Sequence, residues 1–542
     1  MKALAAQILG LIVATGASVL TPRAANCGAK SFDLTVENWK RWNVDKSIRA
    51  FWNGGVDAED VEWPGADSYR QPKEFTTLLG RKLQNKGGWT CSGVPFDASC
   101  DAEGCEEIGR RNKAGKMVSP PSHWGVLALN SVINLHGWMV KIYDGINTGQ
   151  VGASSAAFNI ATDFVKPKDN PNVGFKDLFA GAAAMFGLLG ALPAASWSPF
   201  VAGANAVAGL VGTEVGLHLK GPVEEQNFQT AAAFSSAIQS FAEQARLSIE
   251  EANKKILNSA DDTTLDIISG GQWVNAPTFT QNNVTEFYKR NMIARGINAV
   301  WRQYPVYVYY VWLDDAGARP GEPNTKCDLD RSGPQALKYC ADDGVYYLYM
   351  YNGRGIDWPW GGPKLADKPY FINPIWAIES SARSFKASGG INYDPSKTDA
   401  SRFLGAANIA DYIASPDRLE GTWTLPVCDG SSRGRYNVDY INAKKSDLKD
   451  GIGSPPCACG IDGRDTATFV RAANLDPEDM AKMCLNGWAK AGTSDWPPGA
   501  DRIAYGEEGK HYITKKAIEK CGEETERAVA LGQRRYSCPL LN

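Results

Sequence analysis

The residues whose types could do chemistry are few and scattered along the chain. Gly430-Ser-Ser-Arg-Gly434 has the spacing of a nucleophile elbow, in which Ser432 would be the nucleophile. That chemistry needs an acid and then a histidine downstream, and Asp439 or Asp479 followed by His511 has this order. The residues after Gly434 show no helical pattern, and no strand–helix alternation surrounds them. A polar loop is therefore the favoured interpretation of these residues. A secreted serine hydrolase is kept as the second alternative, after the two functions given at the end of this section.

Metal-binding and acid–base patterns are no stronger. No His-Glu-x-x-His pair, which would place two zinc ligands on one helix face, occurs. Cys457-Ala-Cys459 has the spacing of a redox or metal motif, but structural disulfides are favoured in an oxidising compartment. Solvated turns explain the neighbouring carboxylates, because calcium and glycosidase sites need carboxylates that the fold brings together. No catalytic residue, cofactor or metal ligand is assigned. The histidines are His123, His136, His218 and His511, and the carboxylate pairs are Asp314-Asp315, Asp328 with Asp330, and Asp342-Asp343.

Aromatic residues offer another chemistry, the stacking of rings on sugars. Trp358-Pro-Trp360 lies close in sequence to Tyr349 and Tyr351. Such rings could bind cell-wall polysaccharide, although an aromatic core explains them too and is favoured.

The stretch that the rest of the chain must accommodate is Leu178 to Thr213, which contains no Asp, Glu, Lys or Arg. Its apolar arms, Phe175 to Leu192 and Phe200 to Leu219, are close to the length of about 20 residues that a membrane-crossing helix needs. The segment Pro193–Pro199 between them suits a turn, since proline ends one helix and tolerates the first turn of the next. The sequence therefore predicts a Gly/Ala-rich hydrophobic helical hairpin over residues 175–219.

Two fates are open to this hairpin. It can be a permanently buried core, which is ordinary for an apolar helix in a large protein. It can also leave the helices that surround it and enter a lipid membrane, in a manner similar in design to helical pore-forming toxins. Glu214 opposes insertion, because a carboxylate in hydrocarbon costs about 2.5–3.5 kcal/mol, and acid pH would lower that cost. His218 would have to stay near the interface. The candidate inserting residues are Leu178, Phe179, Met185, Phe186, Leu188, Leu189, Trp197, Phe200, Val207, Leu210 and Val211.

Periodicity predicts the other elements. One apolar stripe, from Phe234 to Ile256 at spacings of three and four, predicts a long amphipathic helix, and the hairpin is its expected partner. Period-two alternation of aromatic and aliphatic residues predicts two strands. The fold class is mainly α (α+β), a helical bundle around the hairpin with a small antiparallel aromatic sheet and disulfide-stapled loops. The predicted helices are Ser122–Tyr143, Ala156–Val165, Val223–Leu257 and Val284–Gln303, and the strands are Val306–Trp312 and Val345–Tyr351.

The N-terminus and the cysteines predict a secreted, extracellular protein. Lys2 followed by an apolar run has the pattern of a signal peptide, with cleavage near Ala17 or Ala25. All 12 cysteines follow it, which allows up to six disulfides, and Cys327 and Cys340 are candidates for a local pair. Asn283-Val-Thr285 is a glycosylation sequon, which would place that turn at the surface.

Length and charge set the remaining limits. The 542 residues predict several domains or subdomains. With 57 basic and 60 acidic residues the net charge is −3, which argues against nucleic-acid binding. Oligomeric state is not readable. The predicted organisation is a signal peptide (1–25), a Cys-rich cap (26–121), a helical bundle with the hairpin (122–303), an aromatic β-hairpin region (304–380) and a Cys-rich C-terminal region (381–542).

Several loose motifs resemble a family of secreted, cysteine-rich fungal proteins of unknown function with a hydrophobic helical hairpin. They are Glu37-Asn-Trp-Lys-Arg-Trp42, the cluster of Cys91, Cys100 and Cys105, His123-Trp-Gly-Val126, the Gly/Ala hairpin, and Tyr339–Leu348. The resemblance implies secretion and the overall plan, but it brings no reaction. The leading hypothesis is a membrane-active, pore-forming-like secreted protein. The alternative is a cell-surface or host-interface binding protein whose hairpin stays buried.

Overall fold

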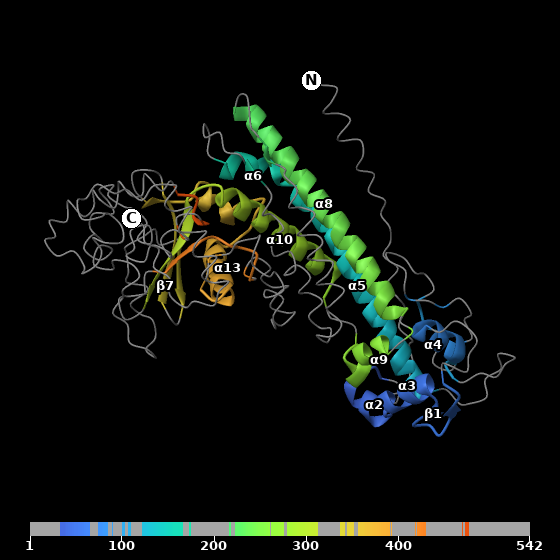
Figure 1. Cartoon of the computed structure of the whole chain (residues 1–542). Helices are drawn as coiled ribbons and strands as arrows, with labels where there is room; N and C mark the ends of the chain where they lie inside the picture. Colours follow the sequence, from blue (N-terminus) through green and yellow to red (C-terminus); the bar gives the residue numbers. More distant parts are fainter. Residues whose placement is uncertain are drawn as a thin grey trace, which may run out of the picture. The chain divides into compact units, whose positions relative to one another are not determined.

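The computed structural model gives a mostly helical protein with small sheets (Figure 1). Its chain divides into two compact units, one from Met1–Lys141 with Ile249–Thr278 and the other from Ile142–Ser248 with Phe279–Asn542. The residues that the structure describes are 33–65, 74–84, 89, 91, 100–102, 107–109, 122–165, 173–174, 216–217, 223–258, 260, 262–275, 279–312, 337–341, 344–351, 356–390, 392, 418, 420–429, 469 and 472–475.

Two long helices contribute to both units. They are α5 (His123–Ser155) and α8 (Val223–Leu257), and α8 has the predicted bounds. Its predicted apolar stripe is buried throughout, from Phe234 to Ile256. Helix α5 continues beyond the predicted end at Tyr143.

Unit 1 packs short helices around an aromatic core. Phe51 lies 5.0 Å from Trp63 and 6.2 Å from Phe75, and Trp63 lies 5.9 Å from Trp124, all as ring-centroid distances. These rings are buried, so the tryptophan-rich N-terminus supplies the core of the predicted cap. The elements are α2 (Val36–Arg41), α3 (Val44–Asn53), β1 (Gly55–Val56), β2 (Glu62–Trp63), α4 (Phe75–Gln84), α9 (Thr263–Ile268) and η6 (Ser269–Gly271), together with parts of α5 and α8.

Side-chain amides tie the distant segments of unit 1 together. Asn134 on α5 donates to the carbonyls of Trp273 and Val274, each at 3.0 Å. Asn253 on α8 donates to the carbonyl of Cys91, whose disulfide to Cys100 has an S–S distance of 2.01 Å. Side-chain amides that satisfy backbone carbonyls in this way specify which segments meet.

Unit 2 is organised around helix α10. The predicted helix begins earlier than expected, at Gln281, because Thr280 forms a capping box with Asn283. Helix α6 and strand β3 both contact α10. The elements of this unit are α6 (Ala157–Phe164), β3 (Val173–Gly174), β4 (Gly216–Leu217), α10 (Gln281–Trp301), β5 (Val306–Trp312), β6 (Lys338–Ala341), β7 (Gly344–Tyr351), β8 (Ile356–Asp357), η8 (Gly362–Ala366), α13 (Pro374–Ala387) and β9 (Val427–Asp429).

Glycines allow the helices of unit 2 to approach α10 closely. A Cβ atom at Gly149 of α5 would lie 2.8 Å from the Cβ of Tyr288 and 2.9 Å from the backbone nitrogen of Lys289. A Cβ atom at Gly296 of α10 would lie 2.2 Å from the ring of Phe234 on α8. Helix α8 therefore packs on α10, while the hairpin that the sequence suggested as its partner lies almost entirely outside the described residues.

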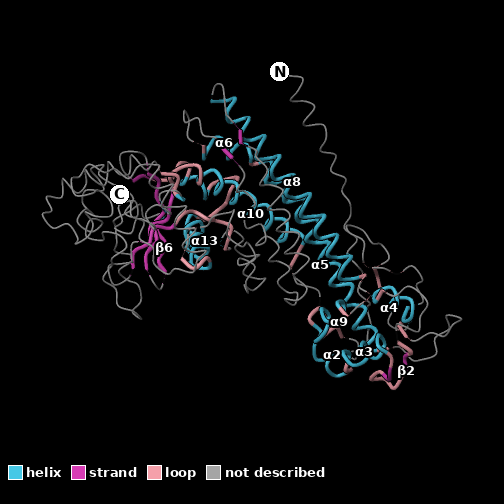
Figure 2. The backbone as a smooth tube through the Cα atoms, viewed as in Figure 1, coloured by secondary structure: helices cyan, strands magenta, loops and turns pink. Residues whose placement is uncertain are grey.

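The aromatic strands form the centre of a five-stranded sheet, drawn in magenta in Figure 2. Strands β5 and β7 pair antiparallel from Val306↔Met350 to Trp312↔Gly344, as predicted. Strand β9 is parallel to β5, so the sheet is mixed, and the expectation of a purely antiparallel sheet is wrong. The reason is that β9 arrives from a distant part of the chain, which the local hairpin pattern does not report.

The segment that leads into β9 is held by side chains. Asn298 of α10 donates to the hydroxyl of Thr424 and accepts from the Thr424 amide. On the other side, Ser380 and Ser384 of α13 bond the backbone of Trp423. Buried backbone groups outside a ladder need such partners, so α10 and α13 together fix this segment.

Of the predicted hydrophobic hairpin, residues 175–219, the structure describes only Gly216 and Leu217, near its C-terminal end. Gly216 and Leu217 form β4, which pairs antiparallel with Val173 and Gly174 of β3. The prediction of a helical arm that extends to Leu219 is therefore wrong at Gly216 and Leu217. Their backbone groups pair with β3 instead of forming helical hydrogen bonds. Residues 175–215 lie outside the described part. Among the described residues no helix combines the length and apolar composition needed to cross a bilayer.

The glycine contacts give a matched pair of stability predictions. We expect Gly149→Ala to lower the free energy of unfolding by about 1–3 kcal/mol, because the new methyl group meets backbone that cannot move aside. At Gly152 the nearest atom is the flexible end of Lys289. Gly152→Ala should therefore leave stability unchanged or raise it by up to about 1 kcal/mol, through helix propensity. Chemical denaturation measures both, and equal effects would contradict the close approach of α5 to α10.

Candidate functional site

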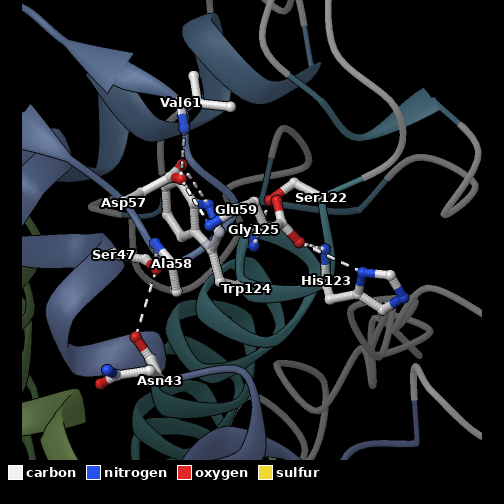
Figure 3. A network of polar contacts seen from close by, with 10 residues as sticks. All are labelled: Asn43, Ser47, Asp57, Ala58, Glu59, Val61, Ser122, His123, Trp124 and Gly125. Atoms are coloured by element: carbon white, nitrogen blue, oxygen red, sulfur yellow. Dashed lines mark hydrogen bonds and ion pairs between the residues drawn. The ribbon is translucent and has the colours of Figure 1, made fainter.

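A buried carboxylate organises the polar site shown in Figure 3. Asp57 is 1% exposed and accepts four hydrogen bonds. Its Oδ1 accepts from the amides of Glu59 and Val61, at 2.8 and 3.0 Å. Its Oδ2 accepts from the indole nitrogens of Trp63 and Trp124, at 2.8 and 2.9 Å. A buried charge is tolerated when donors surround it in this way, so Asp57 fixes the loop after β1 to the start of α5.

That loop positions a second carboxylate at the N-terminus of α5. Glu59 Oε1 accepts from the backbone amide of His123 at 2.8 Å and lies 3.2 Å from its Nδ1 (Figure 3). The hydroxyl of Ser122 accepts from the Gly125 amide at 3.1 Å, so Ser122 caps the N-terminus of this helix. A carboxylate beside the unpaired amides of a helix N-terminus is stabilised by the helix dipole.

The imidazole ring of His123 is held between two groups. Its ring stacks on Trp42 with a centroid distance of 3.8 Å and an interplanar angle of 15°, while Glu59 holds Nδ1. The guanidinium of Arg41 lies 5.6 Å from the centroid of the Trp42 ring. The site thus gathers a carboxylate, an imidazole and an indole, and it is partly exposed at Glu59 and His123.

This arrangement can fix and orient an imidazole, but it forms no metal centre. Among the described residues no group of three or more His, Cys, Asp or Glu is placed to hold a metal ion. The hydrogen-bond donors to both carboxylate oxygens of Asp57 belong to the protein itself, so its role is structural. The Glu59–His123 pair links two segments of unit 1, and we assign it no catalytic step.

Unit 2 contains a comparable charged cluster around Glu379 of α13. The Glu379 side chain is buried and binds Arg418 through two contacts of 2.6 and 2.8 Å, and Arg383 at 2.6 Å. This bidentate pairing joins α13 to the start of the segment that leads into β9. The buried charge is neutralised within the protein, which indicates a structural role.

Asp144 of α5 is a carboxylate of unit 2 with an uncompensated oxygen. Its Oδ2 is buried and has no hydrogen-bond partner. Burial raises the pKa of this carboxyl group above its ordinary value of 3.8. Titratable groups perturbed in this way are enriched at functional sites, but no second reactive group is placed beside it by the described contacts.

The residues singled out from the sequence fall into three groups. Asn283 is exposed in the first turn of α10, where its Oδ1 accepts from Thr280, so the sequon lies in a helix rather than a turn. Cys340 is disulfide-bonded, while Cys327 lies outside the described residues. Trp360 is 39% exposed, whereas Tyr349 and Tyr351 are buried.

The remaining candidates lie outside the described part of the chain. They are the inserting candidates Leu178, Phe179, Met185, Phe186, Leu188, Leu189, Trp197, Phe200, Val207, Leu210 and Val211, the elbow residues Gly430–Gly434 with Ser432, Asp439, Asp479 and His511, the Cys457-Ala-Cys459 motif, His218, and the three carboxylate pairs.

Sequence reasoning missed the Asp57–Glu59–His123 network. Asp57 and Glu59 occur in a loop that reads as solvated, and His123 follows 64 positions after Glu59. The one available signal was the tryptophan density around Trp63 and Trp124, since buried indoles need acceptors.

Comparison with known proteins adds no assignment. No protein-family model matches the chain, and neither a curated protein nor a solved structure is significantly similar to it.

The hydrogen bonds of Asp57 predict a strong asymmetry between two conservative substitutions. Asp57→Asn removes the charge and turns a donor toward other donors, so it should destabilise unit 1 by about 3 kcal/mol or more. Glu59→Gln keeps an oxygen for the His123 amide and should cost less than about 1 kcal/mol. Hydrogen-exchange mass spectrometry of the peptide covering 57–61 should show faster exchange in Asp57→Asn alone. Equal exchange in both variants would refute the structural role of Asp57.

Asp144 predicts a pH-dependent effect. Because its folded-state pKa lies above the unfolded value, the folded protein binds this proton more tightly, and stability falls as pH rises through the interval between the two values. Asp144→Asn should therefore raise the melting temperature near pH 7, and this advantage should shrink below about pH 4. A variant that is less stable than the parent near pH 7 would show that the charged form has a compensating partner.

Proposed function

We propose that this is a secreted, membrane-active protein whose uncharged stretch Leu178–Thr213 is the inserting element. One observation carries the proposal: strands β3 and β4 pair Val173 with Leu217 and Gly174 with Gly216. The residues that flank the uncharged stretch on its two sides are therefore paired with each other. A segment anchored at a single base can change its environment as one piece without separating the elements on either side.

The position of this base supports the proposal. Strand β3 contacts α10, the helix on which α5, α6 and α8 also pack in unit 2. Insertion of the stretch would therefore leave the α10 packing in place. The free-energy gain would come from apolar surface leaving water, at about 25 cal/mol per Å².

The cysteines support export. Every cysteine in the described part of the chain is disulfide-bonded, namely Cys91, Cys100, Cys340 and Cys428. Persistent disulfides are typical of oxidising compartments, so they agree with the signal-peptide pattern at the N-terminus. The sequon at Asn283 is a proposed glycosylation site of the exported protein, at an exposed residue.

A second candidate is a cell-surface binding protein whose hairpin stays buried. The exposed indole of Trp360 favours it, because an exposed tryptophan can stack on a sugar ring. The burial of Tyr349 and Tyr351 removes the wider aromatic platform that the sequence suggested.

Dye release from liposomes tests the proposal between about pH 4 and about pH 7. The wild-type protein should release dye, and more strongly at the acid end, where protonation of Glu214 removes the insertion cost of about 2.5–3.5 kcal/mol. Gly212→Asp should abolish release by placing a charge inside the stretch.

The matched control is Leu247→Asp, which adds the same charge at an exposed apolar residue of α8. It should leave dye release unchanged, and circular dichroism should show both variants folded. Absence of release by folded wild-type protein at every pH would end the membrane proposal.

A further inference from the structure

The loop between β8 and α13 presents two aromatic side chains to solvent. Trp360 is 39% exposed and Phe371 is 52% exposed, whereas the neighbouring Tyr370 is buried. We infer that these two side chains form an interfacial anchor, which docks unit 2 on the headgroup region of a phospholipid bilayer. The inference rests on the proposed membrane activity, and it assigns a distinct step, docking, to a distinct surface.

The loop is rigid enough to present them. The carbonyl of Trp360 accepts from the indole of Trp301 on α10 at 2.9 Å. The hydroxyl of Tyr370 donates to Asp163 of α6 at 2.9 Å, and the amide of Ile372 donates to the carbonyl of Leu365 at 2.8 Å. Both aromatic tips thus project from a backbone fixed on either side of each residue.

The backbone of Phe371 indicates that its exposure is built in. Its φ is +51°, in the left-handed region that bulky residues seldom adopt. Its amide still donates to the carbonyl of Asp367 at 3.0 Å, so the conformation is part of the loop. A large apolar side chain that is held outward in an unfavourable conformation is a common feature of binding surfaces.

The polar neighbours favour a membrane over a sugar. Both carboxylate oxygens of Asp163 are taken, one by Lys364 at 2.6 Å and the other by Tyr370. A sugar site needs polar groups that remain available to hydroxyls. Aromatic tips flanked by lysines, here Lys364 and Lys368, are instead typical of residues at a membrane interface.

Chain length places the loop close to the base of the uncharged stretch. The loop packs on the C-terminal end of α6, where Phe164 lies 5.0 Å from the ring of Tyr370. From Val165 the linker 166–172 leads to β3, and even fully extended it spans at most about 28 Å. The anchor and strand β3, which precedes the uncharged stretch, are therefore within reach of one patch of bilayer.

Charge predicts the lipid preference. Lys364 is paired with Asp163, and Lys368 is next to Asp367, so the loop has no excess of positive charge. The anchor should therefore bind a zwitterionic bilayer through its aromatic side chains and gain little from anionic lipid.

Vesicle co-sedimentation of the full chain tests the anchor separately from dye release. With phosphatidylcholine vesicles, Trp360→Ser and Phe371→Asn should each weaken binding roughly tenfold, the loss expected for one buried aromatic side chain. Asn is well suited to a positive φ, so Phe371→Asn should melt no lower than the wild type. Leu247→Ser, which removes an exposed apolar side chain of α8, is the control and should bind like the wild type.

Each outcome has one meaning. Wild-type binding that both loop variants weaken supports the anchor, even if no dye is released, in which case the proposed insertion fails and the docking surface stands. Binding that the loop variants leave unchanged overturns the anchor, whether or not dye is released. It is also overturned if the wild type does not bind vesicles, or if binding requires phosphatidylserine. Retention by insoluble cell-wall polysaccharide without vesicle binding would assign Trp360 to the sugar-binding alternative.

Discussion

The close packing of other elements on helix α10 is the constraint on which unit 2 depends. Gly149 lets α5 approach the backbone of α10, and Gly296 admits the ring of Phe234 from α8. Interiors are packed as densely as organic crystals, so a single methyl group at such a contact has nowhere to go. Because α6 and β3 contact the same helix, α10 also positions the short ladder that β3 forms with β4.

Polar satisfaction provides the second level of organisation in both units. In unit 1, Asp57 supplies the acceptors that two buried indoles and two loop amides need. In unit 2, Asn298, Ser380 and Ser384 do the same for the segment that leads into β9. An unpaired buried polar group costs about 1–3 kcal/mol, so these contacts select one arrangement among similar apolar packings.

The proposed activity divides between two kinds of segment. The uncharged stretch has the composition for hydrocarbon, while the loop carrying Trp360 and Phe371 has the composition for an interface. The helices and the sheet then serve as a rigid support that keeps both attached to one unit. The Glu59–His123 pair belongs to unit 1, where the Glu59 carboxylate accepts a hydrogen bond from the backbone amide of His123 at the N-terminus of α5.

The sequence by itself determined the elements with strong periodicity. The bounds of α8, the burial of its stripe and the pairing of β5 with β7 all follow from local patterns of apolar residues. Such patterns act over a few residues, so they can be read without a fold.

Only the tertiary structure decided which distant residues meet. The parallel addition of β9, the four donors of Asp57, the contact of Glu59 with His123 and the pairing of β3 with β4 join segments far apart in sequence. The exposure of Trp360 and the burial of Tyr349 depend in the same way on what packs around them. The physical reason is that these features are set by close packing and by hydrogen-bond satisfaction between segments, for which one chain without its fold carries no local signal.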